Sequence, residues 1–478
     1  MTRPRLLLVA GCALAALAHL RWGVGALAWL APIPLIHYLR ETTGWRSRVL
    51  FATALTLAWV AATAKIVSAP LPPAFALLGV AFGLIQVAPY LAFDALRRRL
   101  GDRIGVVLFP ALVATAELLQ VRFTELANWG ATGNTQVDNL PLLQVASLAG
   151  VAGVGFVVNL VAAAGELAWA RRTFRPLAIA VTIAFVAHGF GAARLAQTDT
   201  GMVRVAAVNT IATFGPEANL DAAQRAQIVD TLLADTAEAA RAGAKLVVWT
   251  EASLLAELDE ERPVIDRIRA TAAAHRIHVV AGYVLPGSPL FQNKLVWVRP
   301  DGRVDHEYWK HHPAPGEPSV VGTEALTAVE DPELGRMGAA LCYDYDFAQL
   351  AAEHGDLGID LIALPSSDWR GIDPIHTQMA AVRAIEQGFS IVRSTRFGLS
   401  SGIDPHGRLR AWSSSFDGGS RVTIVDLPRH RVWTLYGAIG DLFGWLCAAG
   451  SVAALVSVFA RARARRVDRS GGRWHRAG

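Results

Sequence analysis

Apolar and polar residues are distributed unevenly along this chain. Long apolar runs fill the region before about Gly201 and recur once after about Leu435, while the stretch between them is polar and mixed. A membrane-spanning helix needs about 20 largely apolar residues. The pattern therefore predicts two membrane regions that flank one polar domain.

Eight apolar segments are candidates for spanning helices. They lie at about Leu6 to Leu20, Val24 to Leu39, Val49 to Ile66, Ala74 to Leu96, Ile104 to Val121, Leu148 to Ala170, Leu177 to Ala193 and Tyr436 to Ala460. The first two are short and nearly adjacent, so they form either two helices or one broken or re-entrant element. We expect a membrane domain of about seven helices over residues 1–200, and a last helix with a basic tail over residues 431–478.

The basic residues predict an orientation for these helices, because cytoplasmic loops of membrane proteins carry the excess of Lys and Arg. With the N terminus inside, the inside segments hold Arg3, Arg5, Arg40, Arg46, Arg48, Arg97, Arg98, Arg99, Arg103, Arg171, Arg172 and Arg175. The alternate loops hold only Arg21, Lys65, Arg122 and Arg194. The polar domain over residues 201–430 is then expected on the extracytoplasmic side.

Composition favours a membrane protein and argues against a nucleic-acid-binding protein. Hydrophobic residues make up 53% of the 478 residues, which is above the usual share of a soluble domain. The net charge of +5 comes from arginines in short loops and in the tail, so it gives no basic face for nucleic acid.

The polar middle changes to short β-rich runs with helical stretches between them. The predicted strands are Val203 to Val208, Lys245 to Trp249, Ile277 to Tyr283, Leu295 to Arg299, Met337 to Leu341, Leu361 to Leu364, Ser390 to Arg393 and Arg421 to Val425. Between the first two, Leu220 to Arg241 has apolar residues at helical spacing. Turns at Pro300-Asp301-Gly302 and Asp404 to Gly407 predict hairpins. The order favours one layered α/β domain.

Three short stretches place a reactive side chain just beyond a β-rich run or in the turn region after one, and these side chains are Glu251, Lys310 and Cys342. Catalytic residues of layered α/β folds collect at such strand ends. Each residue alone is more typical of a solvated or buried structural position. Together they suggest nucleophilic chemistry, because a carboxylate can accept the thiol proton and a lysine can stabilise a thiolate or an oxyanion. The sequence shows no disulfide framework and no Cys/His ligand spacing, so we expect neither a metal nor a cofactor.

Glu, Lys and Cys in this order resemble the nitrilase superfamily of carbon-nitrogen hydrolases. With apolar helices before and after, the whole chain is similar to the apolipoprotein N-acyltransferase family. The segment Ser366-Ser367-Asp368-Trp369, followed by His376, Gln378-Met379-Ala380, Arg383-Ala384 and Glu386, resembles that family's region after the nucleophile strand. The resemblance implies a multi-pass α-helical membrane domain with an α/β nitrilase-like αββα sandwich.

The resemblance also implies a reaction in a bacterial inner membrane. Cys342 would take an acyl chain from a phospholipid as a thioester, with Glu251 as general base, and pass it to the amine of a diacylglyceryl-cysteine lipoprotein. Lys310 would line the oxyanion site with the backbone N–H of Tyr343, and Glu317 would support the site. Trp249, Trp309 and Trp369 lie beside the motif residues, and each would line an acyl pocket, pack in the core or make contacts at the rim of the site. We expect a monomer.

The sequence departs from the family pattern in regions that would contact substrate. Glu317 lies in Pro313-Ala314-Pro315-Gly316-Glu317, one residue closer to the lysine than the resemblance implies. Ala127-Asn128-Trp129-Gly130 replaces a Phe-Pro-Trp run, Thr213-Phe214-Gly215 lacks an expected tryptophan, and Arg396 replaces an uncharged polar residue. The alternatives are a membrane-tethered amidase, an acyltransferase with a different amine acceptor, and a non-enzymatic protein that binds lipid or a partner.

Overall fold

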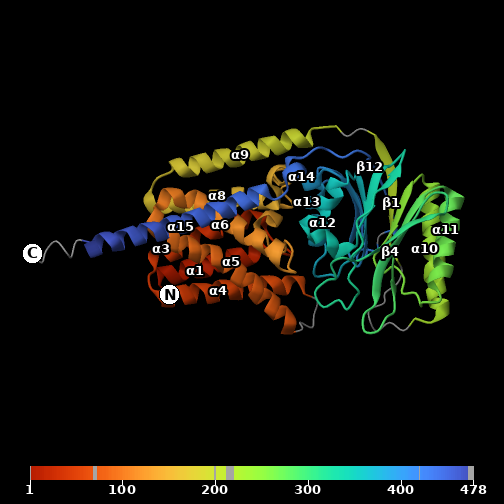
Figure 1. Cartoon of the computed structure of the whole chain (residues 1–478), viewed down its shortest axis with the longest axis horizontal. Coiled ribbons are helices and arrows are strands. Elements are labelled where there is room, and N and C mark those ends of the chain that lie inside the picture. The colour runs from red at the N-terminus through yellow and green to blue at the C-terminus, as the bar shows by residue number, and fades with distance from the viewer. Residues whose placement is uncertain (1, 68–72, 199–200, 211–219, 419, 472–478) are drawn as a thin grey trace, which may run out of the picture. The chain divides into compact units, whose positions relative to one another are not determined.

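The computed structural model describes residues 2–67, 73–198, 201–210, 220–418 and 420–471. The chain divides into two compact units (Figure 1). The helical unit comprises Met1–Ala192 and Ile439–Gly478, and the sheet unit comprises Ala193–Ala438.

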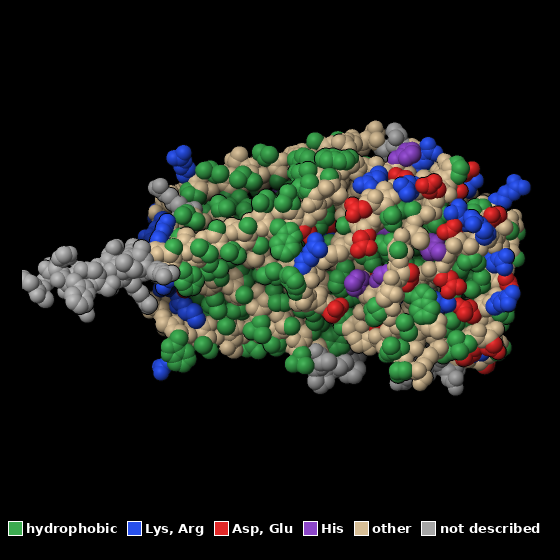
Figure 2. Space-filling model, viewed as in Figure 1, with side chains coloured by type: hydrophobic (Ala, Val, Ile, Leu, Met, Phe, Trp, Pro, Cys, Tyr) green, Lys and Arg blue, Asp and Glu red, His purple; other side chains and the backbone are tan. Residues whose placement is uncertain are grey.

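The helical unit is built from long apolar helices that run alongside one another (Figure 1). Its elements are α1 (Arg3–Ala18), α2 (Gly25–Ala28), α3 (Pro32–Glu41), α4 (Trp45–Thr63), η1 (Ala64–Ile66), α5 (Pro73–Leu100), α6 (Asp102–Phe123), η2 (Thr132–Gln136), α7 (Leu140–Leu143), α8 (Ala146–Arg171), α9 (Arg175–Leu195) and α15 (Leu442–Gly471). A further short helix, α14 (Leu435–Ile439), lies where the two units join in sequence. Among the described residues, six helices are long and apolar enough to cross a membrane. Large apolar side chains are exposed on these helices, among them Leu57, Leu84, Val107, Phe185 and Phe459, and Figure 2 shows apolar side chains over much of one face of the helical unit.

The first two apolar segments form shorter elements than the others. Helix α1 has 16 residues, and the second segment is divided into α2 with four residues and α3 with ten. At a rise of about 1.5 Å per residue, α3 is about 15 Å long, half the thickness of a bilayer core. Pro32 and Pro34 lie in the first turn of α3, which fits the preference of proline for helix starts.

Ion pairs gather the arginine-bearing loops at one end of the helical unit. Arg40, near the end of α3, binds Glu166 of α8 at 2.7 Å and Asp102 of α6 at 2.8 Å. Arg171, at the end of α8, binds Asp102 at 2.7 Å. Loops that are separated by two passes through the unit therefore meet at the same end, as the alternating arginine pattern requires.

The sheet unit contains two six-stranded sheets. Its strands are β1 (Met202–Val208), β2 (Leu246–Trp249), β3 (His278–Leu285), β4 (Gln292–Val298), β5 (Val304–Trp309), β6 (Val329–Asp331), β7 (Gly335–Ala339), β8 (Leu361–Ser367), β9 (Ser390–Arg396), β10 (Leu399–Ile403), β11 (Leu409–Ser414) and β12 (Val422–Pro428). Its helices are α10 (Ala222–Arg241), α11 (Glu261–His275), η3 (Cys342–Asp346), α12 (Ala348–Asp356) and α13 (Ile375–Gln387). The sheet orders are β12-β1-β2-β3-β4-β5 and β11-β10-β9-β8-β7-β6.

The two sheets face each other and helices cover their outer faces (Figure 1). One apolar core combines Val205 and Val248 of the first sheet with Met337, Leu361 and Ile391 of the second. A second core packs helices α10 and α11 against the first sheet. Helix α13 packs against β9 and β10 of the second sheet. The expected αββα sandwich is therefore the observed fold.

Each of the eight predicted strands corresponds to an observed strand, with ends that differ by up to three residues. Strands β5, β6, β10 and β11 were not predicted as strands, although both predicted hairpin turns form. The Gly302 N–H donates to Arg299 O at 2.9 Å, and the Gly407 N–H donates to Asp404 O at 2.9 Å. The helix expected from Leu220 begins at Ala222, because Asp221 caps it in a reciprocal pair with Gln224.

Candidate active site

The three reactive side chains predicted from the sequence come from both sheets. Glu251 follows β2 and Lys310 follows β5 in the first sheet, and Cys342 begins η3 after β7 in the second. All three are buried, with exposed fractions of 3%, 2% and 5%. The Lys310 ammonium donates to Glu251 Oε1 at 2.8 Å. The structure therefore brings Glu251 and Lys310 into direct contact.

The turn that carries Glu251 lies unusually close to strand β3. A Cβ on Gly282 would lie 2.6 Å from Thr250 O and 3.1 Å from Glu251 Cα, so a larger residue would force the turn outward. Ser253, two residues after Glu251, donates from its N–H and hydroxyl to Gly282 O at 3.1 and 2.6 Å. Gly282 and these hydrogen bonds fix the backbone that presents Glu251.

Asn293 and Glu317 complete the hydrogen-bond network around Lys310. The Lys310 ammonium also donates to Glu317 Oε2 at 2.6 Å. The Asn293 amide on β4 donates to Glu251 Oε1 at 2.7 Å and to Glu317 Oε1 at 2.8 Å. Two carboxyl groups therefore share one ammonium and one amide in a buried site, despite the shifted spacing of Glu317 in the sequence.

Burial and ion pairing shift the pKa values of the charged groups in this network in opposite directions. Burial alone would lower the pKa of Lys310, but Glu251 and Glu317 outweigh it and raise that pKa above its usual value. Burial would raise the pKa of Glu317, but Lys310 lowers it below the usual range. Lys310 is consequently a fixed positive charge at neutral pH.

The thiol of Cys342 is enclosed by the end of strand β8. Its S–H donates to Ser367 O at 3.4 Å, and the Ser367 N–H donates to Sγ at 3.5 Å. Burial raises the pKa of Cys342 well above its usual value, Glu251 raises it further, and Lys310 opposes the rise. The resting thiol is therefore neutral and needs a base before it can attack.

The backbone at Cys342 is held in a conformation that side chains rarely adopt, with φ of +47°. Asp344 stabilises this turn, because it accepts from Leu341 N–H at 3.0 Å and from the Tyr308 hydroxyl at 2.7 Å. It also accepts from His312 N–H at 2.7 Å. Asp344 thus joins the Cys342 turn to the segment that carries Lys310. Burial raises the pKa of Asp344 to about 6, against the opposing effect of Lys310.

A second buried charge cluster lies beside Cys342. His376 contacts Asp368 at 2.7 Å and Asp346 at 2.9 Å through its two ring nitrogens. Arg393 donates to both oxygens of Asp368, at 2.8 and 3.1 Å. Burial would lower the pKa of His376, but the two carboxylates raise it to about 9. Asp346, Asp368, His376 and Arg393 therefore form a closed set of two anions and two cations.

Cys342 and two side chains of this cluster also meet the distance requirement for a metal site. Cys342, Asp368 and His376 each place one ligand atom within 4.8 Å of the others. The ring nitrogens of His376 already face two carboxylates, and the Arg393 guanidinium covers Asp368. These partners occupy the atoms that a metal ion would need, and a charged Arg393 would repel it.

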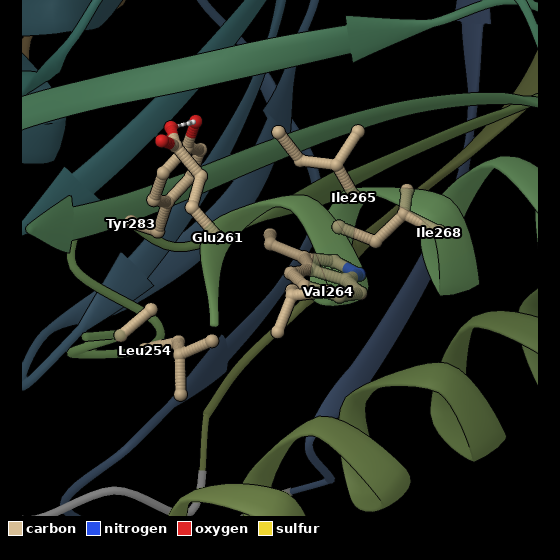
Figure 3. Close-up of a pocket in the computed structure, with 8 residues that line it drawn as sticks. Leu254, Glu261, Val264, Ile265, Ile268 and Tyr283 are labelled. Atoms are coloured by element: carbon tan, nitrogen blue, oxygen red, sulfur yellow. Dashed lines mark hydrogen bonds between the residues drawn. The ribbon is translucent and has the colours of Figure 1, made fainter. Parts of the chain in front are cut away.

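Trp249 and Trp369, two of the three tryptophans near the motif residues, have different environments. Trp249 is 1% exposed and its indole N–H donates to Thr236 at 2.8 Å, so it belongs to the core. Trp249 is also one of the residues that line a cavity of only about 10 Å³. Figure 3 shows the hydrogen-bonded pair Glu261 and Tyr283 at that cavity. That space holds at most one water molecule and no acyl chain. Trp369, which follows Ser367 by two residues, is 37% exposed.

The other positions that depart from the family pattern lie in both units. Trp129 is buried in the helical unit, where its carbonyl accepts from the Gln120 amide at 2.8 Å. Phe214 lies outside the described residues. Arg396 ends β9 in the sheet unit and donates to the Ser367 hydroxyl at 3.1 Å. Tyr343, whose backbone N–H was assigned to the oxyanion site, is 8% exposed and packs edge-on against Phe347.

Sequence reasoning assigned no role to Asn293, Ser367 or Asp344, although each contacts a site residue or holds its turn. Strand β4 begins with the polar residues Gln292, Asn293 and Lys294 before its apolar half, and the structure buries Asn293 and Lys294. Because buried polar groups need partners, polar residues at the start of a core strand were the available signal for a functional position. Ser367 contacts Cys342 through its backbone, so its side chain offers no such signal.

Comparisons with known proteins agree with both units. The carbon-nitrogen hydrolase family model matches residues 204–434, and the model of the apolipoprotein N-acyltransferase N-terminal domain matches residues 11–164. The apolipoprotein N-acyltransferase of Geobacter metallireducens is 25% identical, with 96% of both chains aligned. That of Caulobacter vibrioides is 26% identical, with 92% of this chain and 91% of the relative aligned.

A solved structure of an amidase from Nesterenkonia sp. is 18% identical, with a TM-score of 0.41 over 48% of this chain and 92% of the amidase. The two family models together match most of the helical unit and nearly all of the sheet unit, and the relatives align over almost the whole chain. The chain therefore belongs to the apolipoprotein N-acyltransferase family, within the carbon-nitrogen hydrolases.

Proposed function

We propose that this chain transfers an acyl chain from a phospholipid, through a thioester on Cys342, to the N-terminal amine of a diacylglyceryl-cysteine lipoprotein. The observation that carries this proposal is the buried thiol of Cys342 beside the hydrogen-bonded pair Glu251 and Lys310. The six membrane-length helices and the family membership support lipid substrates. A membrane domain in the same chain keeps the enzyme at the bilayer, where both substrates carry their acyl chains.

In the first half-reaction, Glu251 accepts the S–H proton of Cys342 as the sulfur attacks the ester carbonyl carbon. The carbonyl oxygen becomes an oxyanion, which the Lys310 ammonium and the backbone N–H of Tyr343 stabilise. Collapse of this intermediate breaks the C–O bond of the ester. Glu251 returns its proton to the departing alkoxide, which leaves as the lysophospholipid hydroxyl.

In the second half-reaction, the neutral amine of the lipoprotein attacks the thioester carbonyl. Glu251 accepts a proton from the attacking nitrogen, and the same two donors stabilise the oxyanion. The C–S bond then breaks, an amide forms, and the proton returns to the Cys342 sulfur. The cycle needs no net change of oxidation state, because an ester and an amine become an alcohol and an amide.

Glu317 and Asn293 hold the side chains of Lys310 and Glu251 in place during both steps. The fixed charge of Lys310 stabilises the oxyanion most strongly if its ammonium does not move between half-reactions. Its hydrogen bond to Glu317 holds it while Glu251 gains and loses a proton. This division gives the two carboxyl groups separate roles: Glu251 exchanges a proton and Glu317 fixes the lysine.

We also propose a topology for the chain in a bacterial inner membrane. Residues 1–200 form the membrane domain of about seven passes, residues 201–430 form an extracytoplasmic catalytic domain, and residues 431–478 return to the cytoplasm. The ion-paired loops at one end of the helical unit support the arrangement. A reporter inserted between Ser288 and Gln292 should behave as extracytoplasmic, and cytoplasmic behaviour would reverse the topology.

The acyl-enzyme is the direct test of the function. Incubation with phospholipid should add the mass of one acyl chain to Cys342, and hydroxylamine should remove it. The Cys342→Ala variant should show neither the adduct nor activity. An active Cys342→Ala enzyme without any adduct would contradict the mechanism.

The acceptor needs a separate measurement, because water could also resolve the thioester. A diacylated lipopeptide should gain a third acyl chain at its amine, detected by mass. Release of free fatty acid without a triacylated product would indicate an amidase or esterase instead. A triacylated product from a different amine, but not from the lipopeptide, would indicate another acceptor.

A further inference from the structure

Arg396 contacts both of the segments that build the active site. Its Nε donates to the Ser367 hydroxyl at 3.1 Å, and its Nη1 donates to the Ala252 carbonyl at 3.3 Å. Ser367 contacts the Cys342 sulfur through its backbone, and Ala252 directly follows Glu251. One guanidinium therefore touches the neighbours of both the nucleophile and the base.

These contacts connect the two sheets. Arg396 ends β9, where it pairs with Ser367 of the parallel strand β8 in the second sheet. Ala252 belongs to the turn after β2, which is in the first sheet. The distance between Glu251 and Cys342 depends on how the sheets face each other, because no strand ladder joins the two residues. The hydrogen bond from Arg396 to Ala252 directly restrains that spacing.

The position of Arg396 also changes the charge of the site. Burial lowers the pKa of Arg396, and the opposing effects of Glu251 and Cys342 are smaller, but an arginine side chain stays charged at neutral pH. Proton transfer from Cys342 to Glu251 creates an anionic sulfur, and Arg396 adds its positive charge to those of Lys310 and Arg393 near that sulfur. The other charged or titratable groups around Cys342 are Glu317, Asp344, Asp346, Asp368 and His376.

We propose that Arg396 is a positioning residue of the acyl-transfer site, which links the turn after Glu251 to the Ser367 hydroxyl and stabilises the Cys342 thiolate by its charge. This inference rests on the proposed role of Cys342 as nucleophile. It explains how this chain uses a cation where the family resemblance implies an uncharged polar residue. A positive charge near a thiol favours the thiolate, which is the reactive form.

The test compares Arg396→Gln with Arg396→Lys in the full chain. Cys12 and Cys447 are replaced by alanine, so that Cys342 is the only thiol among the three cysteines. The rate of alkylation by iodoacetamide is measured against pH. We expect Arg396→Gln to raise the apparent pKa of Cys342 by about one unit and to slow alkylation about tenfold at pH 7. Arg396→Lys keeps the charge and should restore most of this rate.

Steady-state kinetics provide the second readout. In Arg396→Gln, kcat for transfer from a phospholipid should fall about tenfold, while KM changes by less than about threefold. The same loss should occur with an uncharged p-nitrophenyl ester, because the effect acts on the thiolate. Arg204→Gln is the matched control, since Arg204 is an exposed arginine that pairs with Asp426 on the same unit. It should leave the alkylation profile and both rates unchanged.

Three results would overturn the inference. One is an Arg396→Gln alkylation profile that superimposes on the parent profile. Another is a rise in KM for phospholipid alone with an unchanged profile, which would make Arg396 a binding group for the donor phosphodiester. The third result applies if Arg396→Gln does not fold. In that case, a folded Arg396→Lys protein whose alkylation profile is shifted by the full expected unit would exclude the charge effect, because lysine keeps the charge. If phospholipid does not acylate the parent enzyme but the Arg396 variants give the expected alkylation profiles, only the proposed acyl transfer is refuted.

Discussion

Two buried charge clusters lie next to the same cysteine, and they are built differently. In the first cluster, Glu251 and Glu317 share the single ammonium of Lys310. In the second, two carboxylates face two cations, and Arg393 binds Asp368 with both nitrogens of its fork. The first cluster has one acid more than it has bases, whereas the second is balanced.

This difference in charge balance distinguishes a cluster that takes part in the reaction from a cluster that stabilises the fold. An unbalanced cluster can exchange a proton without losing all of its hydrogen bonds, which suits a general base. A balanced buried cluster resists any change, because removal of one partner leaves an unpaired charge in a medium of low dielectric constant. We therefore expect substitutions in the first cluster to reduce the rate of reaction and those in the second to reduce stability.

The largest effect should come from Glu251→Gln. Glutamine preserves an oxygen that accepts from Lys310, but it cannot take the thiol proton. The rate of acyl-enzyme formation should fall about 1000-fold in a single-turnover assay, since general bases contribute about 100- to 10,000-fold. The thermal unfolding temperature should stay within a few degrees of the parent value. A loss of less than tenfold would remove Glu251 from the role of base.

Asp368→Asn should have the opposite signature. The change leaves the Arg393 guanidinium and the His376 imidazole without their shared carboxylate, and it should lower the free energy of unfolding by about 3 kcal/mol. Denaturant unfolding of the purified protein measures this loss. Asp426→Asn is the control, because that carboxylate pairs on the surface and should change stability by less than about 1 kcal/mol. An equally small effect for Asp368→Asn would contradict a supporting role for its cluster.

The second cluster also predicts a pH dependence of stability. The folded pKa of His376 is raised to about 9 from an ordinary value near 6.5, so its contribution is fully present below pH 6.5 and is lost as pH rises through 9. The loss should reach at most about 3 kcal/mol. Unfolding measured from pH 6 to 10 should show this slope in the parent and a flatter one in His376→Gln. Parallel slopes would indicate that other groups dominate.

A smaller effect is expected at Asn293, which joins the two carboxyl groups of the first cluster. Asn293→Ala removes one donor from Glu251 and one from Glu317, while Lys310 continues to bind both. Of these two lost hydrogen bonds, the one to Glu251 acts on the proposed base, so kcat should fall about tenfold. An unaltered kcat with a large fall in unfolding temperature would instead place Asn293 among the purely structural residues.

The residues at the strand ends could be predicted from the sequence better than the contacts between the two sheets. Glu251 and Cys342 could be found because each follows a predicted β-rich run, whereas Lys310 was assigned from the order Glu, Lys, Cys that resembles the family. Strand β5 was missed because its residues Val304 to Trp309 are mostly polar, as befits a strand at the edge of its sheet.

The contacts across the sandwich depend on how two separate sheets face each other, which no local pattern encodes. Arg396 stood out only as a departure from the family pattern, and its hydrogen bonds to Ala252 and Ser367 required the structure. Trp249 had two readings in the sequence, and its hydrogen bond to Thr236 assigns it to the core.

The central claim is that Cys342 carries the acyl chain between donor and acceptor. The most direct measurement loads the enzyme with a labelled phospholipid, removes excess donor, and follows label after a diacylated lipopeptide is added. If Cys342 is the carrier, label leaves Cys342 at the same rate as it appears on the lipopeptide amine. Triacylated product that forms while label stays on Cys342, or label that leaves only as free fatty acid, would contradict it.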